Sequence, residues 1–306
     1  MTKGQFLEQL TKCLKEEYAG TGWDVEYDIL LKNNDISKYA VVFSPPGEDN
    51  ITPTIYIEDY YEDYIAQKKT MSEIVEEIRL LAAEVQKQLP DYKELAFDFE
   101  SCKPNIFFRL VSQERNKKIL QECPFLPFLD LAITFHVVCR HTIRGVETMN
   151  VTNMLMNYWQ VGTQELMQLA QVNTPRLFPV QLDSLEKMLV RCLTREVESG
   201  AEREGDHDSL IHSPLLILTN TKGTYGASVI VYPDLMKKLS DQYNTSFYLI
   251  PSSVHEVLLL PEDSKDALEG ISLMVSQVNL DYVRDEDVLS DHAYFYDRKE
   301  NRFLLK

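Results

Sequence analysis

The last third of the chain alternates short apolar runs with turn-forming residues, and this rhythm restricts the fold more than any other feature of the sequence. Apolar runs of this length, bounded by Gly, Pro, Asn or Asp, are typical of strands. Helical patterns at residues 233–243 and 263–278 interrupt them. The order predicts a ββαββα unit followed by a closing β-hairpin. The predicted strands are "PLLILTN", "ASVIVYP", "FYLIP", "VLLLP", "HAYFY" and "RFLLK".

The N-terminal part of the chain repeats this mixture of helices and strands. The spacing of Phe6, Leu10 and Leu14 predicts an amphipathic helix near the start of the chain. A second, long helix is predicted over residues 70–89, where Thr70 and Glu73 form a capping box. Three β-rich runs lie between the two helices, at residues 23–33, 38–47 and 50–57.

These patterns predict an α+β protein made of two lobes of mixed sheets with flanking helices. We expect the first lobe to cover residues 1–112 and the second to cover residues 113–306. The boundary is placed where the long-helix pattern has ended and strands restart. A single compact unit is the alternative.

The charge balance disfavours nucleic acid as a direct partner. The chain has 48 acidic and 31 basic residues, which give a formal net charge of −17. A phosphate backbone would therefore approach against a repulsive field. The same excess of acids allows another hypothesis, in which the protein imitates nucleic acid and occupies the site of a basic protein. That hypothesis requires the acidic side chains to line up along one surface.

The cysteines and the apolar segments indicate a cytoplasmic protein that does not cross a membrane. The five cysteines are scattered and form no CxxC pair, which favours reduced thiols over disulfides or a zinc site. The longest apolar stretch, residues 125–139, is interrupted by Asp130 and His136 and is too short to span a bilayer. The N-terminal residues lack the unbroken apolar segment of a signal peptide.

Two serines, a histidine and a glutamate fall within five consecutive residues, "SSVHE", at 252–256. One interpretation is a hydrolytic site in which Ser253 is the nucleophile and His255 is its base. In an extended segment these two side chains share a face, but Glu256 points to the opposite face, so another residue would have to orient the base. The alternative is a polar turn between antiparallel strands, in which the serines bind backbone groups.

The predicted topology brings one more residue to this stretch. If "ASVIVY" and "FYLI" are parallel strands joined by a crossover helix, the carboxyl end of the first strand, at Tyr232, lies near the turn. Ligands tend to bind at the carboxyl ends of parallel strands. We therefore expect a binding site of this lobe to lie where Tyr232, Ser252, Ser253 and His255 converge.

The sequence carries no familiar cofactor or metal motif. Neither GxxxxGK[ST] nor GxGxxG occurs, so no cofactor is expected. His136, His141 and the "DHD" of residues 206–208 fit neither an HExxH zinc motif nor an Asp-rich calcium loop. No metal site is predicted.

The acidic stretch "IEDYYEDY", residues 57–64, allows two interpretations. A helix here would present carboxylates beside tyrosine rings, which is typical of a protein-docking patch. The alternative is a half-buried helix whose tyrosines cover the sheet and whose acids keep it soluble.

Five phrases are spread from the N-terminal third to the last residues of the chain. They are "ITPTIYIEDYYEDY" at 51–64, "NTPRLFP" at 173–179, "ILTNTKGTYGASVIVYP" at 217–233, "FYLIPSSVHEVLLLP" at 247–261 and "VLSDHAYFYD" at 288–297. Together they resemble an uncharacterised bacterial family, a domain of unknown function of gut-associated Gram-positive genomes. The resemblance covers the full length of the chain and implies no activity, cofactor or catalytic residue.

These observations predict an accessory or regulatory protein that acts by binding a macromolecular partner, such as another protein, or a small ligand. A hydrolase that uses Ser253 and His255 is the first alternative, although no established catalytic motif supports it. The acidic nucleic-acid mimic is the second alternative.

Overall fold

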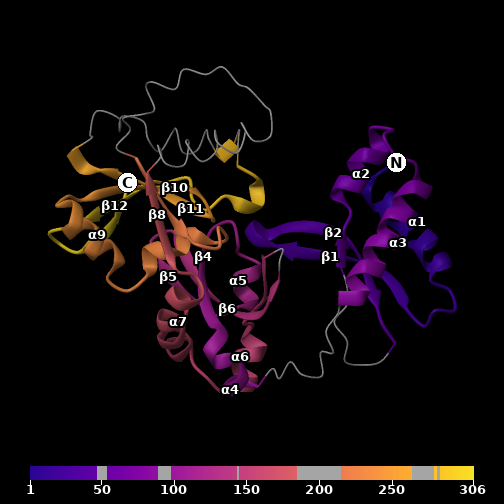
Figure 1. Cartoon of the computed structure of the whole chain (residues 1–306), viewed down its shortest axis with the longest axis horizontal. Helices are drawn as coiled ribbons and strands as arrows, with labels where there is room; N and C mark the ends of the chain where they lie inside the picture. Colours follow the sequence, from indigo (N-terminus) through magenta and orange to yellow (C-terminus); the bar gives the residue numbers. More distant parts are fainter. Residues whose placement is uncertain (47–53, 89–97, 143–144, 185–214, 264–278, 281–282) are drawn as a thin grey trace. The chain divides into compact units, whose positions relative to one another are not determined.

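The computed structural model of the chain describes residues 1–46, 54–88, 98–142, 145–184, 215–263, 279–280 and 283–306 (Figure 1). The chain divides into two compact units, Met1–Phe97 and Asp98–Lys306. The α+β class and the two-lobe organisation are confirmed. The boundary expected near residue 112 lies instead at 97/98, because the strand Ile106–Ser112 pairs along its length with a strand of the second unit.

The first unit packs three helices on a small antiparallel sheet. Helix α1 (Lys3–Glu17) begins at a capping box in which Thr2 and Gln5 bind each other's backbone amides. Its buried face, which includes Phe6, Leu10 and Leu14, shares a core with the sheet. The other elements are β1 (Asp24–Lys32), β2 (Ile36–Ser44), β3 (Thr54–Tyr56), α2 (Glu58–Ile65) and α3 (Met71–Gln88).

Helix α2 places its tyrosines inward. The rings of Tyr61 and Tyr64 lie 5.5 Å and 5.2 Å from the ring of Phe6, between centroids. The carboxylate of Asp63 lies 3.4 Å from the amino groups of both Lys68 and Lys69. Partly buried tyrosines packed against the core and an acid engaged in ion pairs agree with the half-buried helix rather than with a docking patch.

The second unit begins with a four-stranded antiparallel sheet. In it β6 (Leu131–Thr142) pairs with β4 (Ile106–Ser112), β5 (Phe125–Phe128) and β7 (Gly145–Asn150). One face carries Phe108, Leu110 and Phe135 into the main core. Around it lie α4 (Phe99–Cys102), η3 (Lys103–Asn105), α5 (Ile119–Glu122), α6 (Asn153–Trp159) and α7 (Thr163–Leu177), and α7 packs against β4 (Figure 1).

The outer edge of β4 is covered by hydroxyl groups. The backbone N–H of Phe108 donates to Oγ1 of Thr174 on α7 at 3.1 Å. The backbone N–H of Leu110 donates to Oγ of Ser228 at 2.9 Å. Both hydroxyl groups are buried, so two amides that no strand pairs with are still satisfied.

A six-stranded sheet completes the second unit, in the order β13-β12-β10-β11-β9-β8. Every strand pair in the described residues is antiparallel, so no parallel pair of the expected mixed sheets is found among them. The closing hairpin, β12 with β13, is confirmed. The strands are β8 (Val180–Ser184), β9 (Leu216–Asn220), β10 (Phe247–Ser253), β11 (Glu256–Pro261), β12 (Tyr294–Asp297) and β13 (Arg302–Leu305).

The predicted strand "ASVIVYP" is wrong. Residues Gly226–Val231 form a 3₁₀ helix, η4, whose first five residues are buried. It is followed by α9 (Leu235–Tyr243), so no crossover joins parallel strands. A short, wholly apolar run has no periodicity that separates a buried helix from a buried strand. The last helix predicted for the ββαββα unit, at 263–278, lies almost wholly outside the described residues.

The four cysteines that the structure describes are free thiols, and one of them is strongly shielded. Burial, with a smaller contribution from the charge of Asp98, raises the pKa of Cys102 to about 11. Because the thiolate is the reactive form, we expect iodoacetamide to modify Cys102 at pH 8 on the order of 100-fold more slowly than an ordinary exposed thiol. The rate should rise about tenfold per pH unit towards pH 10. Mass spectrometry of labelled peptides tests this, and labelling at the rate of free cysteine would contradict it.

Candidate functional site

The stretch "SSVHE" forms the end of the hairpin between β10 and β11. Val254 and His255 make the turn, and the pairing register shifts at Ser252. The backbone N–H of His255 donates to Oγ of Ser253 at 3.0 Å, and Oγ of Ser252 donates to Oε1 of Glu256 at 3.3 Å. These contacts are those of a polar turn whose side chains bind local groups.

Both ring nitrogens of His255 are engaged with residues other than Ser253. Nδ1 accepts the backbone N–H of Tyr225 at 3.2 Å, so the ring proton sits on Nε2. Nε2 then donates to Oδ1 of Asp287 at 3.2 Å, and Arg284 holds the other oxygen of that carboxylate at 2.8 Å. His255 could serve Ser253 as a base only after its bond to Tyr225 broke and the ring turned. Its present role is to tie the hairpin to two neighbouring loops.

Tyr232 is not brought together with the other three predicted residues. Its hydroxyl donates to the carbonyl of Phe178 at 2.7 Å, and burial raises its pKa above the ordinary value. Tyr225, which contacts His255, and Tyr232 stand at opposite ends of η4. At about 2 Å of rise per residue, the ends of this 3₁₀ helix lie on the order of 10 Å apart. The expected convergence depended on a strand that the chain does not form.

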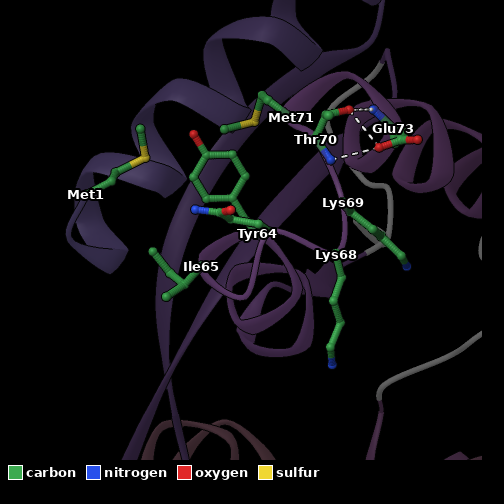
Figure 2. A pocket seen from close by; sticks show the side chains of 9 residues that line it. Met1, Tyr64, Ile65, Lys68, Lys69, Thr70, Met71 and Glu73 are labelled. Atoms are coloured by element: carbon green, nitrogen blue, oxygen red, sulfur yellow. Dashed lines mark hydrogen bonds between the residues drawn. The ribbon is translucent and has the colours of Figure 1, made fainter.

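The first unit has a broad hollow of about 570 Å³, lined by residues between Met1 and Glu73 (Figure 2). Figure 2 shows Thr70 and Glu73 bound to each other at its edge, while Lys68 and Lys69 point away from the ring of Tyr64. The amino group of Lys69 also lies 2.8 Å from Glu77. These charged groups are committed to ion pairs and to capping α3, so we do not place the site here.

A second cavity, of about 310 Å³, lies in the second unit, and we call it the loop pocket. Three connections meet there: the segment after β4, the turn between β5 and β6, and the segment before β12. Its volume lies within the range of pockets that hold small molecules. Its lining residues are Ser112, Glu114, Arg115, Asp130, Ser290, Asp291 and His292.

Two side-chain hydrogen bonds hold Asp130 in the loop pocket. Its Oδ1 accepts from the hydroxyl of Tyr294 at 2.8 Å and its Oδ2 accepts from Oγ of Ser290 at 2.7 Å. Tyr294 is fully buried, and burial together with the charge of Asp130 raises its pKa, so it stays a donor. Leu129, in the same two-residue turn, has φ of 56°, an unfavourable value for leucine. A locally strained turn thus holds a half-buried carboxylate at the cavity wall.

Asp291 supplies a second fixed carboxylate to the loop pocket. Its Oδ1 accepts from Nδ2 of the buried Asn279 at 2.9 Å, and its Oδ2 accepts from Nη2 of Arg115 at 2.8 Å. Burial alone would raise the pKa of Asp291, but the hydrogen bonds from Asn279 and Arg115 outweigh burial and lower it. Both carboxylates are therefore oriented before any ligand arrives.

The described residues offer neither a metal-binding cluster nor a membrane-spanning helix. No group of three or more His, Cys, Asp or Glu side chains in these ranges is arranged to hold a metal ion. His207 of the "DHD" stretch lies outside the described residues. None of the helices that the structure describes is long and apolar enough to cross a membrane.

Residues 3–298 match the profile of a family of unknown function, DUF5688, which spans nearly the whole chain. The chain belongs to DUF5688. The full-length resemblance to an uncharacterised family is confirmed. No curated protein and no solved structure matches the DUF5688 chain significantly. Membership of this family of unknown function assigns no activity to the DUF5688 chain.

Sequence reasoning missed the residues of the loop pocket in this DUF5688 chain. Asp130 drew notice only because it interrupts an apolar stretch, and Ser290 and Asp291 lie within a phrase that carried the family resemblance. A charged residue inside an apolar run was the available signal, since such a residue needs partners. The partners stand about 160 residues away along the chain, at Ser290 and Tyr294, and no periodicity links them.

Proposed function

We propose that this DUF5688 protein acts by binding, and that its ligand is a small polar molecule with an amino group held in the loop pocket. One observation carries the proposal: the carboxylate of Asp130 is fixed by Ser290 and Tyr294 at the wall of a cavity of about 310 Å³. Each carboxylate oxygen keeps a free lone-pair direction after these bonds. A carboxylate oriented in advance binds an ammonium group with little further loss of side-chain freedom.

The other charges of the loop pocket support a cationic ligand. Asp130, Asp291 and Glu114 contribute three carboxylates, against the single guanidinium of Arg115. Arg115 is already paired with Asp291 at 2.8 Å. The net negative charge that remains favours a positively charged ligand over an anionic one.

An accessory role in the cytoplasm completes the proposal. The free thiols of Cys13, Cys102, Cys123 and Cys139 suit a reducing compartment. A protein partner that responds to the occupied pocket would make the binding regulatory. No nucleic acid is proposed as a direct partner, because the net charge of −17 opposes it.

The two alternative functions have less support. A hydrolase centred on Ser253 and His255 would require the imidazole to leave Tyr225 and turn towards the serine. A nucleic-acid mimic needs free acids along one surface, whereas Asp63 and Asp241 are engaged with basic side chains. The mimic hypothesis would gain support if the protein bound a basic DNA-handling protein and this binding depended steeply on salt concentration.

Replacing Asp130 by asparagine tests the pocket. We expect putrescine, spermidine or an amino acid such as L-lysine to bind the unmodified protein, and Asp130→Asn to weaken that binding at least about tenfold, since a hydrogen bond to a charged group is lost. Asparagine keeps the shape of the side chain, and the hydroxyls of Ser290 and Tyr294 can turn to accept from it. Isothermal titration calorimetry gives the affinities.

Glu165→Gln is the matched control, because it removes one exposed negative charge of the second unit from a residue that does not line the pocket. Its affinity should equal that of the unmodified protein. Equal weakening by both substitutions would mean a general effect of charge. Failure of all three probes to bind would remove the proposal.

A further inference from the structure

Arg115 brings a positive charge to the wall of the otherwise acidic loop pocket. Its backbone N–H donates to Oγ of Ser112 at 3.3 Å, which holds the residue close to the end of β4. Nη2 donates to Oδ2 of Asp291 at 2.8 Å, and the side chain of Arg115 is 39% exposed. The guanidinium is therefore fixed in direction and still within reach of a ligand in the cavity.

Most hydrogen-bond donors of this guanidinium are unused. A guanidinium has five N–H groups in a planar fork, and Asp291 is the only side chain that Arg115 binds in the described part of the chain. The fork offers more than one pair of parallel N–H groups, so one bond to Asp291 leaves a pair for a second carboxylate. Asp291 is itself held by Asn279, so the guanidinium is oriented before a ligand binds.

Asp130 and Arg115 stand close to the same end of a strand pair. Ser112 of β4 pairs with Leu131 of β6, and the backbone N–H of Gln113 donates to the carbonyl of Asp130 at 3.2 Å. The two charges do not neutralise each other, because Asp130 binds two hydroxyl groups whereas Arg115 binds a different carboxylate. A negative and a positive group therefore line the same small cavity.

We propose that the loop pocket binds a basic amino acid, whose α-carboxylate pairs with Arg115 while an ammonium group pairs with Asp130, an inference that rests on the proposed function. A ligand that carries both charges matches both groups of the cavity, whereas an amine alone leaves the donors of Arg115 unused. Asp291 and Glu114 keep the lining net negative, which favours a second ammonium group in the ligand over a neutral side chain.

L-Lysine and cadaverine, compared by isothermal titration calorimetry on the full chain, test this assignment. Cadaverine is lysine without the α-carboxylate, so it carries the larger positive charge, and a site that recognised charge alone would prefer it. We expect the unmodified protein to bind L-lysine at least about tenfold more tightly than cadaverine, since the carboxylate adds charged hydrogen bonds. Arg115→Gln should remove this preference. Glutamine can still donate to Asp291, so that carboxylate keeps a partner.

A matched variant and a third ligand serve as controls. Arg140→Gln removes an arginine that also lies beside a carboxylate, 3.6 Å from Glu147, but does not line the pocket. This variant should keep the preference for L-lysine. L-Norleucine lacks the ε-amino group of lysine, and we expect it to bind the unmodified protein about tenfold more weakly than L-lysine does.

The results separate the role of Arg115 from that of Asp130. If L-lysine and cadaverine bind the unmodified protein equally and Asp130→Asn weakens both, the pocket recognises amines alone, and only the pairing of a carboxylate with Arg115 is refuted. A preference for L-lysine that survives in Arg115→Gln would refute that pairing as well, because a structural role of Arg115 would change both affinities by the same factor. L-Norleucine binding as tightly as L-lysine would overturn the basic side chain. If no amine binds, the proposed function falls together with this inference.

Discussion

Gly226→Ala is expected to lower the free energy of unfolding of the second unit by about 3–5 kcal/mol, because there is no room for a methyl group. A Cβ at this position would lie 2.1 Å from Oγ1 of Thr219, 2.3 Å from the carbonyl oxygen of His255 and 2.9 Å from the backbone nitrogen of Asn220. Two of these atoms belong to backbone that is fixed by the β9 strand and the β10–β11 turn. Urea unfolding followed by circular dichroism measures the loss.

Gly162→Ser is the control for this experiment. Nothing lies within 4 Å of the Cβ position of Gly162, which is the N-cap residue of α7. Serine is favoured at an N-cap, so the variant should be as stable as the unmodified protein or slightly more stable. If Gly226→Ala unfolded at the same urea concentration as Gly162→Ser, the close approach of η4 to the hairpin turn would be refuted.

Acidification from pH 7 to pH 5 is expected to lower the free energy of unfolding by about 2 kcal/mol through His136 alone. Burial and the charge of Arg109 hold the pKa of His136 in the folded chain well below its ordinary value of 6.5. The unfolded chain therefore binds a proton at this residue below about pH 6.5, while the folded chain does not. The stability is fully present above that pH and is lost as the pH falls towards the pKa of the folded state.

His136→Gln isolates this contribution. Glutamine can keep a contact to Thr134 and does not titrate. Between pH 7 and pH 5, the free energy of unfolding of the variant should therefore fall by about 2 kcal/mol less than that of the unmodified protein. His292→Gln, which removes an exposed histidine and leaves His136 in place, is the matched control. If the free energy of unfolding fell by the same amount in His136→Gln and in the unmodified protein, His136 would not be kept neutral in the folded chain.

The parts of the fold that could be predicted are those with a clear period or a clear end. The face of Phe6, Leu10 and Leu14 predicted α1, and the pair Thr70 and Glu73 marked the start of α3. The turn interpretation of "SSVHE" also agrees with its contacts, because serine next to a turn has few competing roles.

The residues that sequence reasoning could not place depend on contacts between distant segments. Residues 226–231 read as a strand, and only the hydrogen bonds from Leu110 to Ser228 and from Ala227 to Val254 show why a 3₁₀ helix fits there. The expected position of Tyr232, at the carboxyl end of that strand, depended on the same error. Arg115 stood within the polar segment "QERNKK", and its place at the wall of the loop pocket follows only from the packing of distant segments.

The hydroxyl groups along the outer edge of β4 also affect how the protein meets other chains. An edge strand with free amides is a template on which an extended segment of another molecule can add as a further strand. Here Thr174 and Ser228 already occupy the amides of Phe108 and Leu110. The sheet is therefore closed to strand addition at this edge, which removes one route to self-association through its most buried strand.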